Sequence, residues 1–223
     1  MKAKSIAPHT ISRLRPGRIV LDCSGPIHRE WLREALFERG LKVLVYRRCF
    51  ESDQMNELPV HADLQMASGE LEVVLHRMKD AVNLIVDDLG SLHFHERPLE
   101  LLREYYEALA WGGEAWIRFP KTFFVFLEGG RRVSLQEYLA SKYPLIVKRL
   151  RSSEIDRSLL SGASSGDDWI LIRKDRGYPK LFFSIHPRTM GGTSVPNGGA
   201  HAAYLEFVER APMKKSGWFR RAA

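Results

Sequence analysis

The feature that most constrains the fold of this chain is a regular alternation of short apolar runs with segments of helical periodicity. The strand-like runs lie at residues 19–21, 42–46, 60–64 (the weakest), 81–86 and 114–119. Apolar residues recur at helical spacing before Gly40 and in residues 70–79, 98–109 and 134–143. Strands that alternate with helices pair in parallel through right-handed crossovers. The sequence therefore predicts a doubly wound α/β fold, a mostly parallel sheet with helices on both faces.

This alternation ends after residue 144. Residues 145–147 and 169–172 are strand patterns joined by a Ser-rich and Gly-rich segment, so they fit an antiparallel strand at one edge of the sheet. A further strand pattern covers residues 180–185. The expected organisation is a basic N-terminal segment (1–17), an α/β domain (18–176) and a C-terminal extension (177–223) with an extra strand, a Gly-rich loop and a basic tail.

The net charge of +7 and the pI near 9.5 favour acidic partners. The Lys and Arg residues are scattered in small clusters, however, and neither zinc-finger spacing nor an aromatic-basic RNA signature accompanies them. Nucleic acid is therefore the minority interpretation, and a protein partner stays open. No apolar run reaches the length of a bilayer span and no secretory signal is seen, so we expect a cytoplasmic protein with Cys23 and Cys49 reduced.

Ligands of doubly wound sheets bind beyond the carboxyl ends of the strands. The residues expected at that edge are 22–26, Arg47, Asp63 and 87–95. Residues 22–26 join a strand to a helix, and such a junction offers backbone N–H groups and the positive end of a helix dipole. A carboxylate at Asp22 serves equally well as a cap for the turn.

Three segments carry a resemblance to a known family. Residues 82–120 resemble the fourth strand, the following helix and the fifth strand of class I S-adenosylmethionine-dependent methyltransferases. The stretch LDCSGP (21–26) resembles the first motif of that family, and HADL (61–64) resembles its acid-bearing turn after strand three. Order and spacing agree from about residue 18 to residue 174.

The resemblance implies S-adenosylmethionine as the cofactor and methyl transfer as the reaction. Asp22 would approach the methionine amino group, Asp63 would accept the adenine amine, and main-chain groups near Asp87 would line the pocket floor. The implied cofactor-binding residues are Asp22, Cys23, Ser24, Gly25, Pro26, Arg47, Asp63, Leu64 and Asp87. The residues available toward a methyl acceptor are Asp88, His93 and His95.

The chain also departs from the family pattern. The cofactor loop is short and keeps one glycine, Gly25, and the acid expected after the second strand is replaced by Tyr46-Arg47-Arg48. Arginine cannot accept hydrogen bonds from ribose hydroxyls. An alternative is therefore a methyltransferase-like domain without cofactor that acts as a binding or scaffolding subunit. For an enzyme, the acceptor could be a small molecule, a protein side chain or RNA.

A third hypothesis is a cysteine phosphatase, because five residues separate Cys23 from Arg29. Pro26 removes one of the N–H donors that a phosphate cradle needs, and Glu30 adds a negative charge, so this hypothesis ranks last. His93 and His95 lack a second ligand cluster of recognised spacing, and no metal site is expected.

Overall fold

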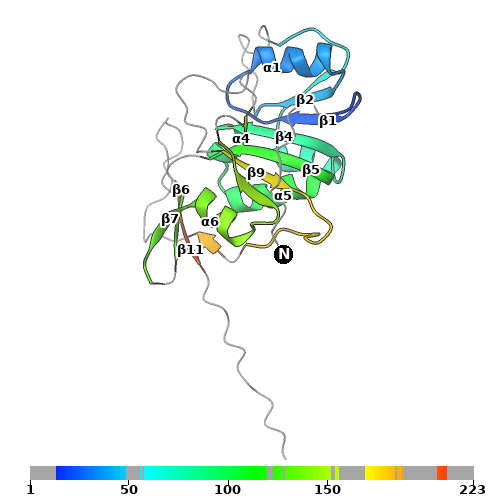
Figure 1. Cartoon of the computed structure of the whole chain (residues 1–223). Coiled ribbons are helices and arrows are strands. Elements are labelled where there is room, and N and C mark those ends of the chain that lie inside the picture. The colour runs from blue at the N-terminus through cyan, green and yellow to red at the C-terminus, as the bar shows by residue number, and fades with distance from the viewer. Residues whose placement is uncertain are drawn as a thin grey trace, which may run out of the picture.

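The computed structural model describes residues 14–48, 56, 58–119, 123–127, 129–151, 154–155, 169–183, 185–187 and 205–209. Their main feature is a seven-stranded sheet in the order β3-β2-β1-β4-β5-β9-β8 (Figure 1). Its strands are β1 (Ile19–Asp22), β2 (Lys42–Tyr46), β3 (Leu64–Ala67), β4 (Val82–Asp88), β5 (Leu109–Arg118), β8 (Val147–Arg149) and β9 (Trp169–Arg173). Within the described residues, no helix has the length and apolar character needed to cross a bilayer.

The sheet is parallel from β3 to β5, and β9 runs antiparallel to both of its neighbours, β5 and β8. The predicted fold class is confirmed. The antiparallel strand lies one place inside the edge, however, because β8 pairs on its outer side. Burial explains this order: four of the five residues of β9 are buried, as in a central strand, whereas β8 has three residues and ends in an exposed arginine.

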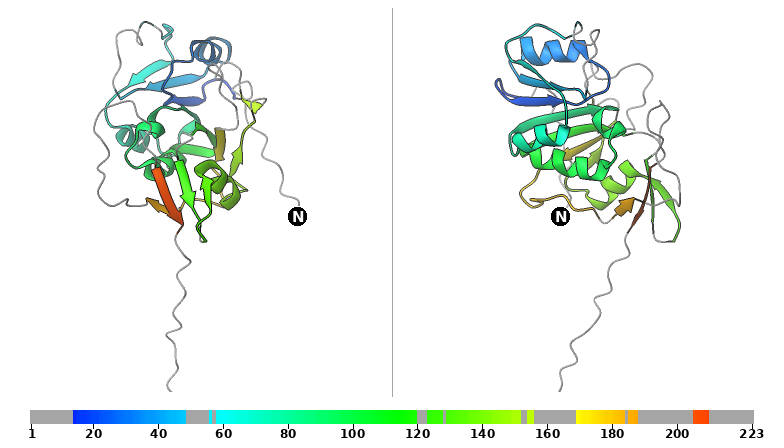
Figure 2. Two further views of the ribbon diagram at one scale, coloured as in Figure 1. Left: turned by 90° about the vertical axis from the view of Figure 1, so that its left-hand side faces the viewer. Right: turned by 180° about the vertical axis from the view of Figure 1, so that it is seen from behind.

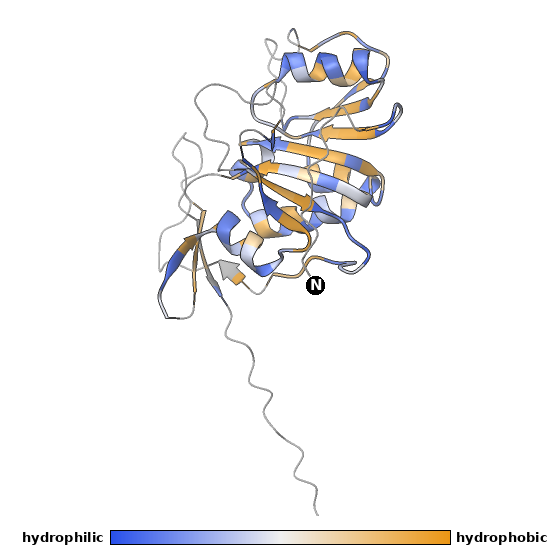
Figure 3. Cartoon of the chain, viewed as in Figure 1, coloured by the Kyte–Doolittle hydropathy of each residue, from blue (hydrophilic) through white to orange (hydrophobic). Residues whose placement is uncertain are grey.

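Helices cover both faces of the large sheet. One face packs against α1 (Arg29–Arg33) and its π-helical continuation η2 (Glu34–Glu38). The other packs against α3 (Leu71–Arg77), α5 (Pro98–Ala108) and α6 (Leu135–Lys142), and the short helix α4 (Ser91–Phe94) follows β4. Figure 3 shows the apolar residues concentrated on the strands between these layers. The predicted cap of the last helix is confirmed, since the Ser134 side chain accepts the N–H of Glu137.

The third strand lies further along the chain than its pattern indicates. Residues 60–64 are wrong as a strand, because β3 begins at Leu64 and ends at Ala67, in parallel register with β2. A turn precedes it: the N–H of Leu64 donates to the carbonyl of His61, and the N–H of Asp63 donates to the His61 ring at 3.1 Å. Asp63 therefore lies at the amino end of β3, whereas Asp22 lies at the carboxyl end of the parallel strand β1.

A second, four-stranded sheet combines two distant parts of the sequence. Its order is β10-β11-β6-β7, with β6 (Phe123–Phe126), β7 (Arg132–Ser134), β10 (Ile185–Pro187) and β11 (Leu205–Glu209). Phe207 of β11 is fully buried and packs edge-on against Phe123 of β6, with ring centroids 6.3 Å apart. The small sheet lies at the opposite end of the molecule from α1 (Figure 2).

Residues 180–185 are also wrong as a strand, because β10 begins only at Ile185. The reason is local: the Tyr143 hydroxyl donates to the backbone carbonyl of Phe182, whose ring is 71% exposed. The Gly-rich loop, the basic tail and residues 1–13 lie outside the described residues. The expected boundaries at residues 17 and 176 stay predictions.

Candidate functional site

The loops that follow β1 and β4 lie in direct backbone contact at the carboxyl edge of the large sheet. The N–H of Gly25 donates to the carbonyl of Asp88 at 2.9 Å, and the N–H of Ser91 donates to the carbonyl of Cys23 at 3.0 Å. A Cβ atom at Gly90 would lie 1.9 Å from the Cys23 carbonyl oxygen. Only glycine allows this approach, so the two loops are closed against each other.

Asp22 stabilises its own turn. It is 1% exposed, and its Oδ1 atom accepts the N–H of Ser24 at 2.9 Å. The Ser24 hydroxyl in turn accepts the N–H of Asp88 at 3.2 Å. The capping role of the Asp22 carboxylate is thus present in the structure.

Arg47 reaches from the end of β2 into the turn after β1. Its Nη1 atom donates to the carbonyls of Tyr46 at 2.6 Å and Asp22 at 3.2 Å. Its Nη2 atom donates to the Pro26 carbonyl at 3.2 Å and lies 3.4 Å from Asp22 Oδ2. The side chain is 7% exposed. The guanidinium therefore neutralises Asp22 and holds the β1 loop to β2.

Asp87 accepts three hydrogen bonds inside the protein. Its two carboxylate oxygens accept the N–H groups of Gly90 and Leu92, each at 2.9 Å, and the Tyr105 hydroxyl at 2.8 Å. Burial raises the pKa of this carboxyl to about 6. The three hydrogen bonds lower the pKa, but the effect of burial is larger. Asp87 orders the start of α4 and the loop before it.

Asp88 lies between Arg118 and His28, two neighbours that the sequence does not reveal. Its Oδ1 atom accepts from Arg118 Nη1 at 3.0 Å, and its Oδ2 atom lies 3.1 Å from His28 Nε2. The second pair is close but not aligned as a hydrogen bond, since neither atom has a hydrogen-bond partner among the described residues. The signal that could have pointed to Arg118 is its position at the end of β5, because β5 pairs with β4 and places Arg118 directly beside Asp88.

The surroundings of Cys23 do not favour the cysteine phosphatase hypothesis. The Cys23 thiol is buried, and burial together with the negative charge of Asp87 raises its pKa well above the usual value, which disfavours the thiolate. Arg29 lies on the exposed outer side of α1 and lines a groove there.

Of the other predicted residues, His93 follows the β4 loop in α4, where its N–H donates to the Gly90 carbonyl, and His95, Asp63 and Leu64 have other neighbours. His95 Nε2 contacts Glu72 Oε1 of α3 at 2.7 Å, and burial lowers the pKa of the half-buried His93. Asp63 precedes β3, and Leu64 is the first residue of this strand. Its carboxyl end continues into Ser68-Gly69, where the Gly69 carbonyl accepts the Tyr46 hydroxyl at 2.6 Å.

These contacts test whether S-adenosylmethionine fits at this edge. Ligand sites are largely pre-formed and present their polar groups toward the ligand. Here Asp22, Ser24, Asp87 and Asp88 are at most 1% exposed and bind one another's loops. In this structure, the polar groups that the resemblance implies for the cofactor therefore contact the protein's own loops. Nor do the described residues contain a cluster of His, Cys, Asp or Glu that could hold a metal ion.

No family model matches the sequence, and no curated protein matches it. Solved structures match it at low identity. A complex of the Haloferax volcanii Trm112 methyltransferase activator with a protein assigned as a methyltransferase has 13% identity and a TM-score of 0.49, over 74% of this chain and 87% of that one. The YcgJ protein of Bacillus subtilis has 14% identity and a TM-score of 0.46, over 75% and 97%.

A third match is the 1,6-didemethyltoxoflavin-N1-methyltransferase of Burkholderia thailandensis, crystallised with 1,6-didemethyltoxoflavin and S-adenosylhomocysteine. It has 15% identity and a TM-score of 0.45, over 72% of each chain. The strand order and helix layers of this chain by themselves define a doubly wound α/β fold, a mostly parallel seven-stranded sheet with one antiparallel strand.

Proposed function

We propose that this chain is a methyltransferase-fold protein that acts as a binding or scaffolding subunit and does not hold S-adenosylmethionine at the carboxyl edge of its sheet. The observation that carries this proposal is the buried guanidinium of Arg47. Four contacts, to Tyr46, Asp22 and Pro26, hold it where the family resemblance implies cofactor-binding groups.

The chemistry of the cofactor supports the same conclusion. S-adenosylmethionine carries a sulfonium cation, and its ribose hydroxyls need acceptors. Arg47 offers a positive charge and only donors. Arg47 is also the ion-pair partner of the buried Asp22, so a ligand that displaced Arg47 would leave this carboxylate unpaired in a buried position.

The second candidate is an S-adenosylmethionine-dependent methyltransferase. It is favoured by the position of Asp22 at the end of β1 in a methyltransferase-like sheet. The acceptor stays open for this candidate.

One titration distinguishes the two candidates. Calorimetry of the purified full chain with S-adenosylhomocysteine and with S-adenosylmethionine is expected to give no binding heat at millimolar ligand, while circular dichroism reports a folded protein. Micromolar binding that is lost in Asp22→Asn would overturn the proposal and establish the methyltransferase candidate.

A further inference from the structure

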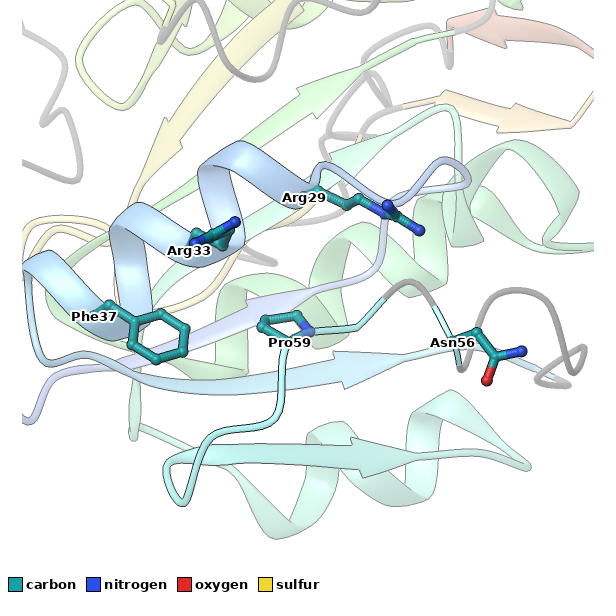
Figure 4. A pocket seen from close by; sticks show the side chains of 5 residues that line it. All are labelled: Arg29, Arg33, Phe37, Asn56 and Pro59. Atoms are coloured by element: carbon teal, nitrogen blue, oxygen red, sulfur yellow. The ribbon is translucent and has the colours of Figure 1, made fainter.

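The large sheet ends on one side in the short strand β3. Among the described strands β3 pairs only with β2, so it forms one edge of the sheet, and β8 forms the other. Figure 4 shows the chain descending from Pro59 past β2 into β3, the outermost strand in this view. An edge strand presents backbone N–H and C=O groups with which a further strand can pair.

Met66 carries the unpaired backbone groups of this edge. The carbonyls of Asp63 and Ala67 accept N–H groups from β2 and the residue after it, at 2.9 and 3.1 Å, so they point toward β2. Backbone groups alternate in direction along a strand, and those of Leu64 and Met66 therefore point outward. The N–H of Leu64 donates to the His61 carbonyl at 3.2 Å, whereas the N–H and carbonyl of Met66 have no partner among the described residues.

The two edges of the sheet differ in how their sequences protect them. Proteins block exposed edge strands with charged side chains, proline or bulges. β8 carries Lys148 and Arg149. Residues 64–69 contain neither a charge nor a proline, and the Met66 side chain in the middle of β3 is 51% exposed. The β3 edge is therefore suited to pairing with another strand.

The helix beside this edge carries charges of both signs. Glu70, just before α3, and Val73 and Arg77 within it are exposed and lie on one side of the helix, at spacings of three and four residues. Glu72 lies on the other side, where it contacts His95 at the end of α4. The side with Glu70 and Arg77 therefore faces away from α4, toward β3. Among the described residues, neither Glu70 nor Arg77 forms an ion pair.

We propose that two copies of this chain pair through β3 in a symmetric dimer, with the two strands antiparallel about a two-fold axis at Met66. The two Met66 residues then exchange both of their N–H···O=C bonds. The N–H of Ser68 in each copy lies opposite the Leu64 carbonyl of the other. Gln65 of each copy meets Ala67 of the other, so every pair of residues across the axis is uncharged.

Charge complementarity favours a second copy as the occupant of this edge. The two-fold axis places both α3 helices antiparallel on one face of the joined sheet. Glu70 of each copy then faces Arg77 of the other, with the Val73 side chains, 45% exposed in the single chain, between these pairs. The order acid, apolar, base matches itself when it is reversed, as the axis requires. The loops after β1 and β4 take no part, so the dimer is compatible with either candidate function.

Sedimentation equilibrium of the full chain measures the dimer. The expected wild-type mass is twice the chain mass of 25.6 kDa. Met66→Lys sets two lysines against each other at the axis, and dimerisation should become at least about tenfold weaker. The matched control is Leu145→Lys, at a side chain that is 55% exposed near β8, which should leave the dimer unchanged. Both positions are exposed, and circular dichroism checks that the variants fold.

A charge swap tests the contact between the helices. Arg77→Glu sets carboxylates against each other and should weaken the dimer. Adding Glu70→Arg to that variant should restore dimerisation, because each pair is then reversed but again complementary. A role of Arg77 in folding alone would give no such rescue.

Three results would overturn the proposal. The first is a wild-type chain that stays monomeric at about 100 μM, including one that pairs through β3 with a different protein instead. The second is a dimer that Met66→Lys leaves intact, because it would lie on another surface. The third is a double variant that dimerises as weakly as Arg77→Glu.

Discussion

At the scale of single residues, Arg47 organises the carboxyl edge of the large sheet. The sequence shows that an arginine stands where the family pattern has an acid. It does not show the direction of the side chain, and an exposed Arg47 could have bound a phosphate or a carboxylate of a ligand. Instead the guanidinium turns into the β1 loop, where its fork matches two carbonyls and one carboxylate at once.

Replacing Arg47 by alanine is expected to destabilise the protein by about 3 to 5 kcal/mol, because it leaves the Asp22 carboxylate buried without its partner. Urea unfolding followed by circular dichroism measures the change. The control is Arg48→Ala, at the exposed neighbouring position, which should cost no more than about 0.5 kcal/mol. Equal effects of the two substitutions would contradict the structural role of Arg47.

Asp87 predicts a pH dependence of stability. Its pKa rises from 3.8 to about 6 in the folded protein, so the folded state holds this proton longer than the unfolded state. The contribution of Asp87 to stability is therefore full below pH 4 and is lost as the pH rises toward 6, by about 3 kcal/mol. In urea titrations, the free energy of unfolding of wild type relative to Asp87→Asn should fall between pH 4 and pH 7. Parallel pH profiles would refute this prediction.

At the scale of elements, pattern reasoning succeeded where runs of residues are continuously apolar. β1, β2 and β4 lie close to where their patterns predict them, because most of their positions are buried on both faces and their central residues are apolar. The weak third pattern failed. β3 is an edge strand with two exposed central residues, so packing puts little constraint on its sequence. That shift moves Asp63 away from the other predicted cofactor residues.

At the scale of the whole molecule, the two sheets share one hydrophobic core. Phe123, Val125 and Phe207 of the small sheet belong to the same cluster as Leu21 and Ile85 of the large sheet. The last described strand thus contributes to the stability of the first, over a separation of more than 180 residues. We expect the molecule to unfold in one transition.

Phe207→Ala tests this coupling. It should cost about 3 to 5 kcal/mol and lower the urea midpoint equally by far-UV circular dichroism and by tryptophan fluorescence. The fluorescence reports on the large sheet, because Trp31 of α1, Trp116 of β5 and Trp169 of β9 are buried in one core cluster on its face. Phe182→Ala, at a ring that is 71% exposed, should cost no more than about 0.5 kcal/mol. A fluorescence midpoint that does not move would mean that the small sheet unfolds by itself.

The sequence by itself determined the fold class and most of the strands, because buried positions recur with the period of a helix or a strand and are occupied by apolar residues. It also placed Asp22, Arg47, Asp87 and Asp88 at one edge, since parallel strands bring their carboxyl ends together. Only the tertiary structure decided which partners these groups have. Arg47 binds Asp22, Tyr105 binds Asp87, and His28 and Arg118 flank Asp88. The sequence does not show which way a charged side chain points, and the role of that side chain depends on the groups that it contacts in the folded protein.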